Sequence, residues 1–166
     1  HLVRPGGRVL DLACGAGRHA RYFAARGHPV TACDRDGAAL AGLAGIPDIT
    51  VREADLENGS AWPFEPAAFE AVVVCNYLHR PLFAQIGASL ATGGVLLYET
   101  FLAGNERYGK PSNPRFLLER DELFAAFAPS LVVVGFEQGL VETVKPALIQ
   151  RLCAVRSENN ENKLEP

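Results

Sequence analysis

Three aspartates, Asp11, Asp34 and Asp55, stand at or near the ends of successive short apolar runs in the first third of the sequence. If these runs form neighbouring parallel strands, the three side chains lie at one edge of a sheet, where open α/β sheets bind their ligands. Carboxylates accept hydrogen bonds from ammonium groups, hydroxyls and amines. The row is therefore suited to a ligand with an ammonium group, a ribose diol and an amine.

A turn of small residues follows the first aspartate in the stretch "DLACGAGRHA", with Ala13, Gly15 and Gly17 set two residues apart. Small residues let the backbone approach a ligand closely, and the helix expected after them directs free N–H groups at an anion. The segment also satisfies G-x-G-x-x-G/A, with Asp34 following 19 residues after Gly15, so a dinucleotide fits the spacing. Asp11 favours a different ligand, because a carboxylate repels a pyrophosphate but accepts hydrogen bonds from an ammonium group.

Apolar runs and helical patterns alternate along the chain, which is typical of βαβ units and of a mostly parallel sheet covered on both faces. The predicted strands are 8–12, 29–34, 49–55, 70–76, 94–100, 131–138 and 147–156. The predicted helices are 17–26, 36–44, 81–91 and 119–127.

The last two predicted strands are joined only by "GLVETVKP", which is too short for the crossover helix that parallel neighbours require. They should therefore form an antiparallel hairpin. The sequence predicts an α/β fold with a Rossmann-like, doubly wound, seven-stranded sheet that is mostly parallel and has an antiparallel last strand.

The composition fits one globular domain over residues 1–156, followed by a polar tail, 157–166, that we expect to be mobile. A formal net charge of −3 gives no electrostatic reason to expect nucleic-acid binding. No apolar run approaches the ~18 residues of a membrane span. The four cysteines lack metal-site spacing and are expected to be reduced thiols of a cytoplasmic protein with no metal. Because the sequence begins at His1 and contains no methionine, we expect further chain to precede it.

The segment "VLDLACGAGRHARYFAARGHPVTACDRD" resembles motif I and the second-strand acid of the class I S-adenosylmethionine-dependent methyltransferases. The resemblance extends over residues 8–156 and includes the final hairpin. It is strongest to small-molecule methyltransferase domains similar to the tellurite-resistance methyltransferases, although this chain has Ala13 where the family often has glycine. The resemblance implies S-adenosylmethionine as cofactor, S-adenosylhomocysteine as product and a small-molecule acceptor.

The resemblance also implies specific cofactor contacts. The turn would face the methionyl part, with Asp11 near its amino group and Arg18 toward its carboxylate. Asp34 would bind the ribose hydroxyls, Asp55 the adenine amine, and the Leu56 backbone the ring. The implied cofactor-binding residues are Asp11, Ala13, Cys14, Gly15, Gly17, Arg18, Asp34, Arg35, Asp55, Leu56, Cys75 and Asn76.

Methyl transfer from a sulfonium is an in-line displacement, so positioning can supply most of the catalysis and a base is needed only for an acceptor that loses a proton. The sequence does not single out a catalytic residue. Predicted substrate contacts come from the segment after the fourth strand and from the long loop 101–118, and they are Tyr77, His79, Arg107 and Tyr108. For His79, capping of the next helix is an alternative, and for the basic loop residues simple solvation is another.

Two other functions fit the same sequence features. An NAD(P)-dependent oxidoreductase would use the turn for a dinucleotide. A non-catalytic protein would bind S-adenosylmethionine without passing its methyl group to an acceptor. The sequence predicts neither the acceptor nor the oligomeric state.

Overall fold

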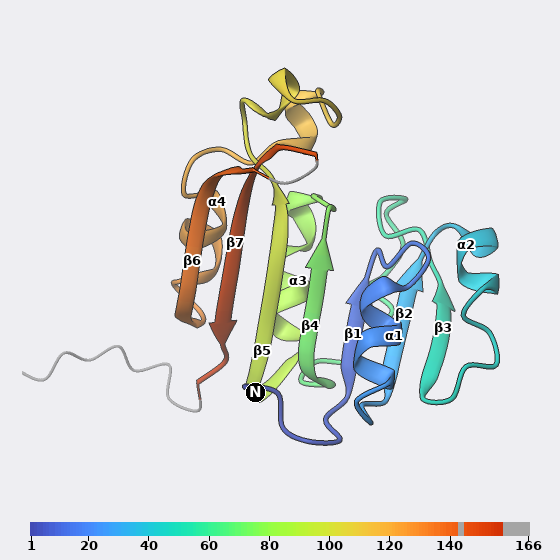
Figure 1. The fold of residues 1–166 in the computed structure, drawn as a ribbon. Helices are drawn as coiled ribbons and strands as arrows, with labels where there is room; N and C mark the ends of the chain where they lie inside the picture. Colours follow the sequence, from blue (N-terminus) through green and yellow to red (C-terminus); the bar gives the residue numbers. More distant parts are fainter. Residues whose placement is uncertain (143–144, 158–166) are drawn as a thin grey trace, which may run out of the picture.

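The computed structural model describes residues 1–142 and 145–157, so the tail predicted over 157–166 lies outside the described residues except for Ser157. A seven-stranded sheet crosses the molecule in the order β3-β2-β1-β4-β5-β7-β6 (Figure 1). The strands are β1 Val9–Leu12, β2 Val30–Asp34, β3 Ile49–Glu53, β4 Phe69–Cys75, β5 Leu90–Phe101, β6 Val132–Val141 and β7 Ala147–Val155.

Strands β1 to β5 pair in parallel, whereas β7 is antiparallel to both of its neighbours, β5 and β6. This arrangement confirms the predicted fold class and the predicted hairpin. The chain builds outward from β1 to β3 and then returns to place β4 on the other side of β1. The strand order therefore reverses between β1 and β4, which is where such sheets bind ligands.

The helices are shorter than the sequence patterns predict: α1 Arg18–Ala24, α2 Gly37–Ala41, α3 Phe83–Ala88 and α4 Glu122–Phe127. Left-handed backbone sets two of the starts, because Gly17 has φ 73° before α1 and Asp121 has φ 60° before α4. Short 3-10 turns occupy η1 Arg80–Leu82, η2 Asn105–Arg107 and η3 Pro114–Phe116. Across residues 1–142 and 145–157, none of the helices combines the length and the apolar character that crossing a bilayer requires.

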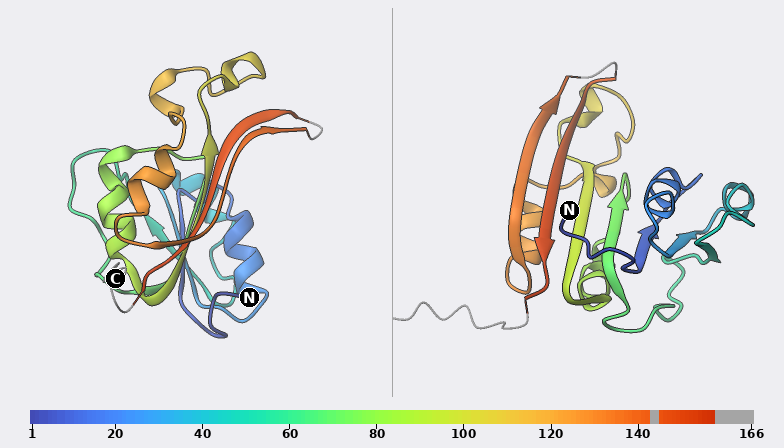
Figure 2. Two further views of the ribbon diagram at one scale, coloured as in Figure 1. Left: turned by 90° about the vertical axis from the view of Figure 1, so that its left-hand side faces the viewer. Right: turned by 60° about the horizontal axis from the view of Figure 1, so that its bottom comes forward.

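Helices lie on both faces of the sheet (Figures 1 and 2). α3 and α4 cover one face, where Leu96, Tyr98 and Phe127 belong to the larger buried cluster. α1 lies on the other face, where Phe23 packs in a second cluster with Val73. The long segment after β5 lies beyond the carboxyl ends of the strands, at the top of Figure 1. The sheet thus brings the predicted turn, the predicted aspartates and this segment to one edge.

Candidate functional site

The turn after β1 has three residues with left-handed backbone: Ala13 with φ 52°, Gly15 with φ 52° and Gly17 with φ 73°. A Cβ atom on Gly17 would lie 2.4 Å from Cδ1 of the buried Leu43, so this glycine is required by packing. A Cβ atom on Gly15 would meet nothing within 4 Å. Of these two glycines, only Gly15 therefore leaves open space beside the turn for a ligand.

Asp11 is 1% exposed, and its contacts differ from those implied by the resemblance. Its Oδ2 accepts a hydrogen bond of 2.8 Å from the backbone N–H of Ala20 in α1, and its Oδ1 lies 3.9 Å from Nδ1 of His19. Burial raises the pKa of this carboxyl to about 6, although the Ala20 hydrogen bond opposes the shift. Asp11 thus fixes the start of α1 from inside the molecule, and its carboxylate is almost wholly shielded from the surface.

Asp34 joins the turn to the end of β2. Its Oδ2 accepts the Gly15 N–H at 2.7 Å, and its Oδ1 accepts the Asp36 N–H at 2.9 Å. Each carboxylate oxygen has a second lone pair, so both can still accept a hydrogen bond from a ligand. Asp34 therefore both orders the turn and presents acceptors to the cavity beside it.

A cavity of about 380 Å³ lies at the ends of the central strands, and we call it the β2–β5 cavity. Its volume is in the range of small-ligand pockets. It brings together predicted residues from four strand ends: Ala13, Asp34, Arg35, Asp55, Leu56, Asn76 and Tyr77. Further lining residues, which the sequence analysis missed, are Ala54, Glu57, Leu78, Thr100, Phe101, Pro111 and Phe116.

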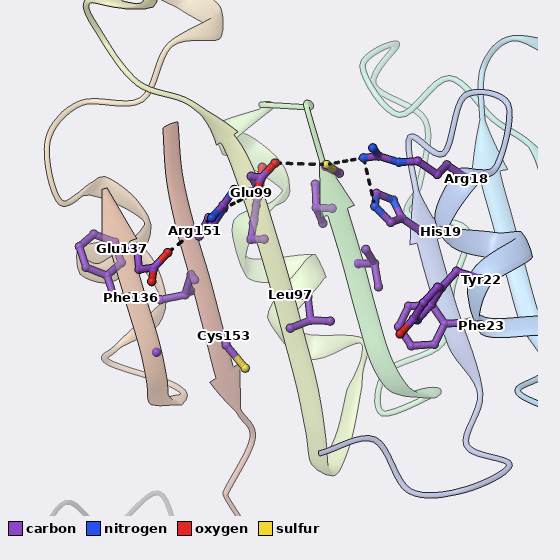
Figure 3. A pocket seen from close by; sticks show the side chains of 16 residues that line it. Arg18, His19, Tyr22, Phe23, Leu97, Glu99, Phe136, Glu137, Arg151 and Cys153 are labelled. Atoms are coloured by element: carbon purple, nitrogen blue, oxygen red, sulfur yellow. Dashed lines mark hydrogen bonds and ion pairs between the residues drawn. The ribbon is translucent and has the colours of Figure 1, made fainter. Parts of the chain in front are cut away.

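A second, larger space of about 700 Å³ lies on the α1 side of the sheet, and we call it the α1-side groove (Figure 3). Its floor is apolar and includes Val73, Leu97 and Cys153. Both the groove and the β2–β5 cavity extend to the end of β4, where Cys75 lines the groove and the next residue, Asn76, lines the cavity.

Polar contacts run across the upper end of this groove from α1 to β6 (Figure 3). Arg18 Nη2 donates to Cys75 Sγ at 3.7 Å, and Cys75 Sγ donates to Glu99 Oε1 at 3.9 Å. Arg151 then pairs with Glu99 and, at 3.5 Å, with Glu137. Arg18 thus reaches from α1 to the end of β4, next to the turn, as a cation for an anionic ligand group.

The structure gives little support for a general base among Glu99, Tyr77 and His79, three titratable side chains close to the end of β4. Glu99 is already paired with Arg151. Burial, followed by the charge of Glu57, raises the pKa of Tyr77 above its usual range, so its phenol stays neutral. His79 precedes η1 without a side-chain hydrogen bond to that turn, and it does not line the cavity or the groove.

Two predicted substrate residues in the long loop point elsewhere. Arg107 Nε donates to Gly104 O within its own turn, at 3.3 Å, and neither Arg107 nor Tyr108 lines the cavity or the groove. The physical reason is the buried Asn105, whose side chain ties η2 to β7 by accepting the Leu148 N–H. The same loop instead contributes its later residues, Pro111 and Phe116, to the cavity.

Cys14 is part of the turn, but its thiol is half-buried against the α1-side core. Burial, followed by the charge of Asp11, raises its pKa to about 12. A thiol with so high a pKa is a poor nucleophile at neutral pH. Cys14 therefore packs the turn, and it does not line the cavity or the groove.

Comparisons with known proteins agree with this geometry. The family described as methyltransferase domain matches residues 9–94, just over half of the chain. No curated protein matches the sequence. TehB from Haemophilus influenzae is similar in structure, with a TM-score of 0.75 and 17% identity over 92% of this chain, which spans only 58% of TehB.

Two further structures are similar over most of both chains. An S-adenosylmethionine dependent methyltransferase from Mesorhizobium loti has a TM-score of 0.72 and 16% identity, covering 93% of this chain and 94% of its own. A TehB-like SAM-dependent methyltransferase from Corynebacterium glutamicum has a TM-score of 0.66 and 21% identity, covering 93% and 82%. At these identities the likeness is one of fold. The chain therefore belongs to the methyltransferase domain family, whose fold it shares with S-adenosylmethionine-dependent methyltransferases.

Proposed function

We propose that the chain transfers a methyl group from S-adenosylmethionine to a small-molecule acceptor and releases S-adenosylhomocysteine. The observation that carries the proposal is the convergence of Asp34, Asp55 and Ala13 on the β2–β5 cavity, at the point where the strand order reverses. The adenosine part would occupy this cavity. The methionyl part would follow the open side of Gly15 toward Arg18.

The turn is poorly suited to a dinucleotide. A pyrophosphate at a helix start needs free backbone N–H groups. Here the Gly15 N–H donates to Asp34 and the Ala20 N–H donates to Asp11, so two of these donors already serve carboxylates. Asp11, which the sequence led us to expect facing the ligand, is buried and does not itself repel a pyrophosphate there.

When bound, S-adenosylmethionine supplies an electrophilic methyl group on its sulfonium. The residues of the chain would contribute by positioning, because an in-line displacement depends on holding the two reacting atoms close and aligned. The ends of β4 and β5 border both spaces, with Cys75 on the groove and with Asn76 and Thr100 on the cavity, and we place the acceptor there. No base is assigned, because the Glu99 carboxylate is already paired with Arg151 and the raised pKa of Tyr77 keeps its phenol protonated.

A small-molecule acceptor also fits the charge of the chain. The formal net charge is −3, and the loop residue Arg107 bonds within its own turn rather than extending from a basic surface. All four cysteines are free thiols, which suits the reducing environment of the cytoplasm, where we propose the protein acts.

Binding of S-adenosylhomocysteine and of NAD(H), measured by isothermal titration calorimetry, tests the cofactor. We expect S-adenosylhomocysteine to bind much more tightly than NAD(H). Asp34→Ala should weaken this binding about ten- to hundredfold, because it removes an acceptor of charge-assisted hydrogen bonds. Asp36→Ala is the matched control, since Asp36 caps α2 through Ala38 and Ala39 and does not line the cavity.

Tighter binding of NAD(H) by the wild-type protein would contradict the proposal. Equal affinities of the Asp34→Ala and Asp36→Ala variants for S-adenosylhomocysteine would show that Asp34 does not contribute to cofactor binding.

A further inference from the structure

Arg80, the first residue of η1, connects the end of β4 to a distant part of the chain. Its guanidinium forms two hydrogen bonds with the Glu122 carboxylate, Nε to Oε1 at 2.5 Å and Nη2 to Oε2 at 2.9 Å. It also donates to the Leu117 carbonyl at 2.9 Å and to the Arg115 carbonyl at 3.2 Å. One side chain thus holds both the segment that precedes α4 and the first turn of α4.

The residue between those two carbonyls is Phe116, which lines the β2–β5 cavity with Asp34 and Asp55. Its side chain is 48% exposed, so the core does not hold it in place. The backbone on either side is fixed instead: Arg80 binds the flanking carbonyls, and Leu117 is buried. The position of the Phe116 ring therefore depends on contacts made by its neighbours.

A second polar side chain holds the other part of the segment that reaches the cavity. Asn105 is 1% exposed, and its Oδ1 accepts the Leu148 N–H from β7 at 3.0 Å. Its Nδ2 donates to the carbonyl of Pro111, the other loop residue that lines the cavity, at 3.4 Å. The segment after β5 is therefore anchored at both of the places where it meets the cavity.

We propose that Arg80 is a positioning residue for ligand binding: by holding the Arg115 and Leu117 carbonyls, it keeps Phe116 in place as an apolar wall of the β2–β5 cavity. An aromatic ring offers a flat apolar surface to a planar base. The ligand class that fits a cavity with the carboxylates of Asp34, Asp55 and Glu57 and such a wall is a purine nucleoside. This inference rests on the proposed function, which places the adenosine part there.

Calorimetric titration of the full chain with S-adenosylhomocysteine tests the inference. Phe116→Ala should weaken binding about two- to tenfold, the range expected for loss of one aromatic contact. Arg80→Gln should weaken it by a similar factor. Because Arg80 acts through Phe116, the double variant should bind no more weakly than Phe116→Ala alone. Phe116→Tyr should bind like the wild type, since it retains the ring.

Arg156→Gln is the matched control. Arg156 also donates to two backbone carbonyls, those of Ala88 and Leu90, but it belongs neither to the cavity nor to the segment after β5. This variant should lose stability and retain the wild-type affinity. If Arg80→Gln does not fold, Glu122→Gln, which weakens the same contact, takes its place in the comparison.

Three results would overturn the inference. If Phe116→Ala and Arg80→Gln both bind S-adenosylhomocysteine with wild-type affinity, Phe116 does not form a wall of the ligand site, although the proposed function is unaffected. Additive losses in the double variant would show that Arg80 does not act through Phe116. Failure of the wild-type chain to bind S-adenosylhomocysteine would overturn the proposed function, and this inference with it.

Discussion

Asp34 and Asp11 show how far a single residue type can be interpreted from sequence. Both follow apolar runs, and both were expected to face the ligand. Asp34 does line the cavity, whereas Asp11 is buried and bonds to the start of α1. The difference is one of burial: Asp11 pairs across the sheet with neighbours in β2 and β4, and this position becomes evident only when the strands are assembled.

The two glycines of the turn should respond differently to alanine. Gly15→Ala places a Cβ in open space and costs about 1 kcal/mol of stability, because left-handed backbone disfavours a side chain. It should also weaken S-adenosylhomocysteine binding at least about tenfold, since the new methyl group occupies the ligand's path. Gly17→Ala should cost about 2–4 kcal/mol, because it adds a clash with Leu43. Urea unfolding measures the stability losses, and calorimetry measures the change in binding. Equal stability losses in the two variants would contradict the assignment of Gly17 to packing and of Gly15 to the open side of the turn.

The buried Asp11 should make stability depend on pH. Its pKa is raised from 3.8 to about 6, so the folded state binds the proton more tightly than the unfolded state. The stability this group contributes is complete below pH ~3.8 and is lost as the pH rises through about 6. Asp11→Asn keeps an oxygen for the Ala20 N–H without a charge, so it should gain up to about 3 kcal/mol over the wild type between pH 4 and pH 8.

Urea unfolding of both proteins across this pH range measures the difference. A free-energy difference between variant and wild type that is the same at pH 4 and at pH 8 would contradict the assignment.

At the scale of elements, alternating apolar and helical patterns predicted every strand, and the short final connection predicted the antiparallel hairpin. The order β5-β7-β6 was not predicted, because apolar runs do not specify which strands are neighbours. The helix starts were also misjudged, since the left-handed backbone of Asp121 depends on contacts with the sheet rather than on local propensity. The position of Pro111 and Phe116 at the cavity was not predicted either, because local sequence does not reveal where a long loop lies.

A side chain of β7 forms hydrogen bonds at the start of helix α4, and its contribution to stability can be measured by substitution. Gln150 of β7 is 0% exposed; its Oε1 accepts the Leu123 N–H at 3.1 Å, and its Nε2 donates to the Glu119 carbonyl. Gln150→Met keeps the length of the side chain but leaves the buried Leu123 N–H unpaired and removes one of the two hydrogen bonds to the Glu119 carbonyl, which also accepts from the Glu122 N–H. We therefore expect a loss of about 2–4 kcal/mol.

Urea unfolding checks this loss, with Gln138→Met as the control. Gln138 occupies the neighbouring position on β6, and its bonds to Asp121 are exposed. Equal losses in the two variants would show that the buried bonds do not determine the stability of α4.

At the scale of the whole molecule, the sheet gathers residues from positions 13 to 116 around one cavity. The family match and the fold agree on the methyltransferase class. The fold does not identify the acceptor, because proteins of one fold act on many substrates and the residues of the individual site determine specificity. Those residues here are at the ends of β4 and β5 and in the segment after β5, where sequence patterns carried the least information.

Transfer of a labelled methyl group from S-adenosylmethionine to the small molecules of a cell extract tests the central claim most directly. We expect the wild-type chain to label one or a few low-molecular-weight compounds. Asp34→Ala should reduce this labelling at least about tenfold at limiting cofactor, whereas Asp36→Ala should not. Binding of S-adenosylhomocysteine with no methyl transfer to any compound would contradict the account and would make the chain a binding protein on a methyltransferase fold.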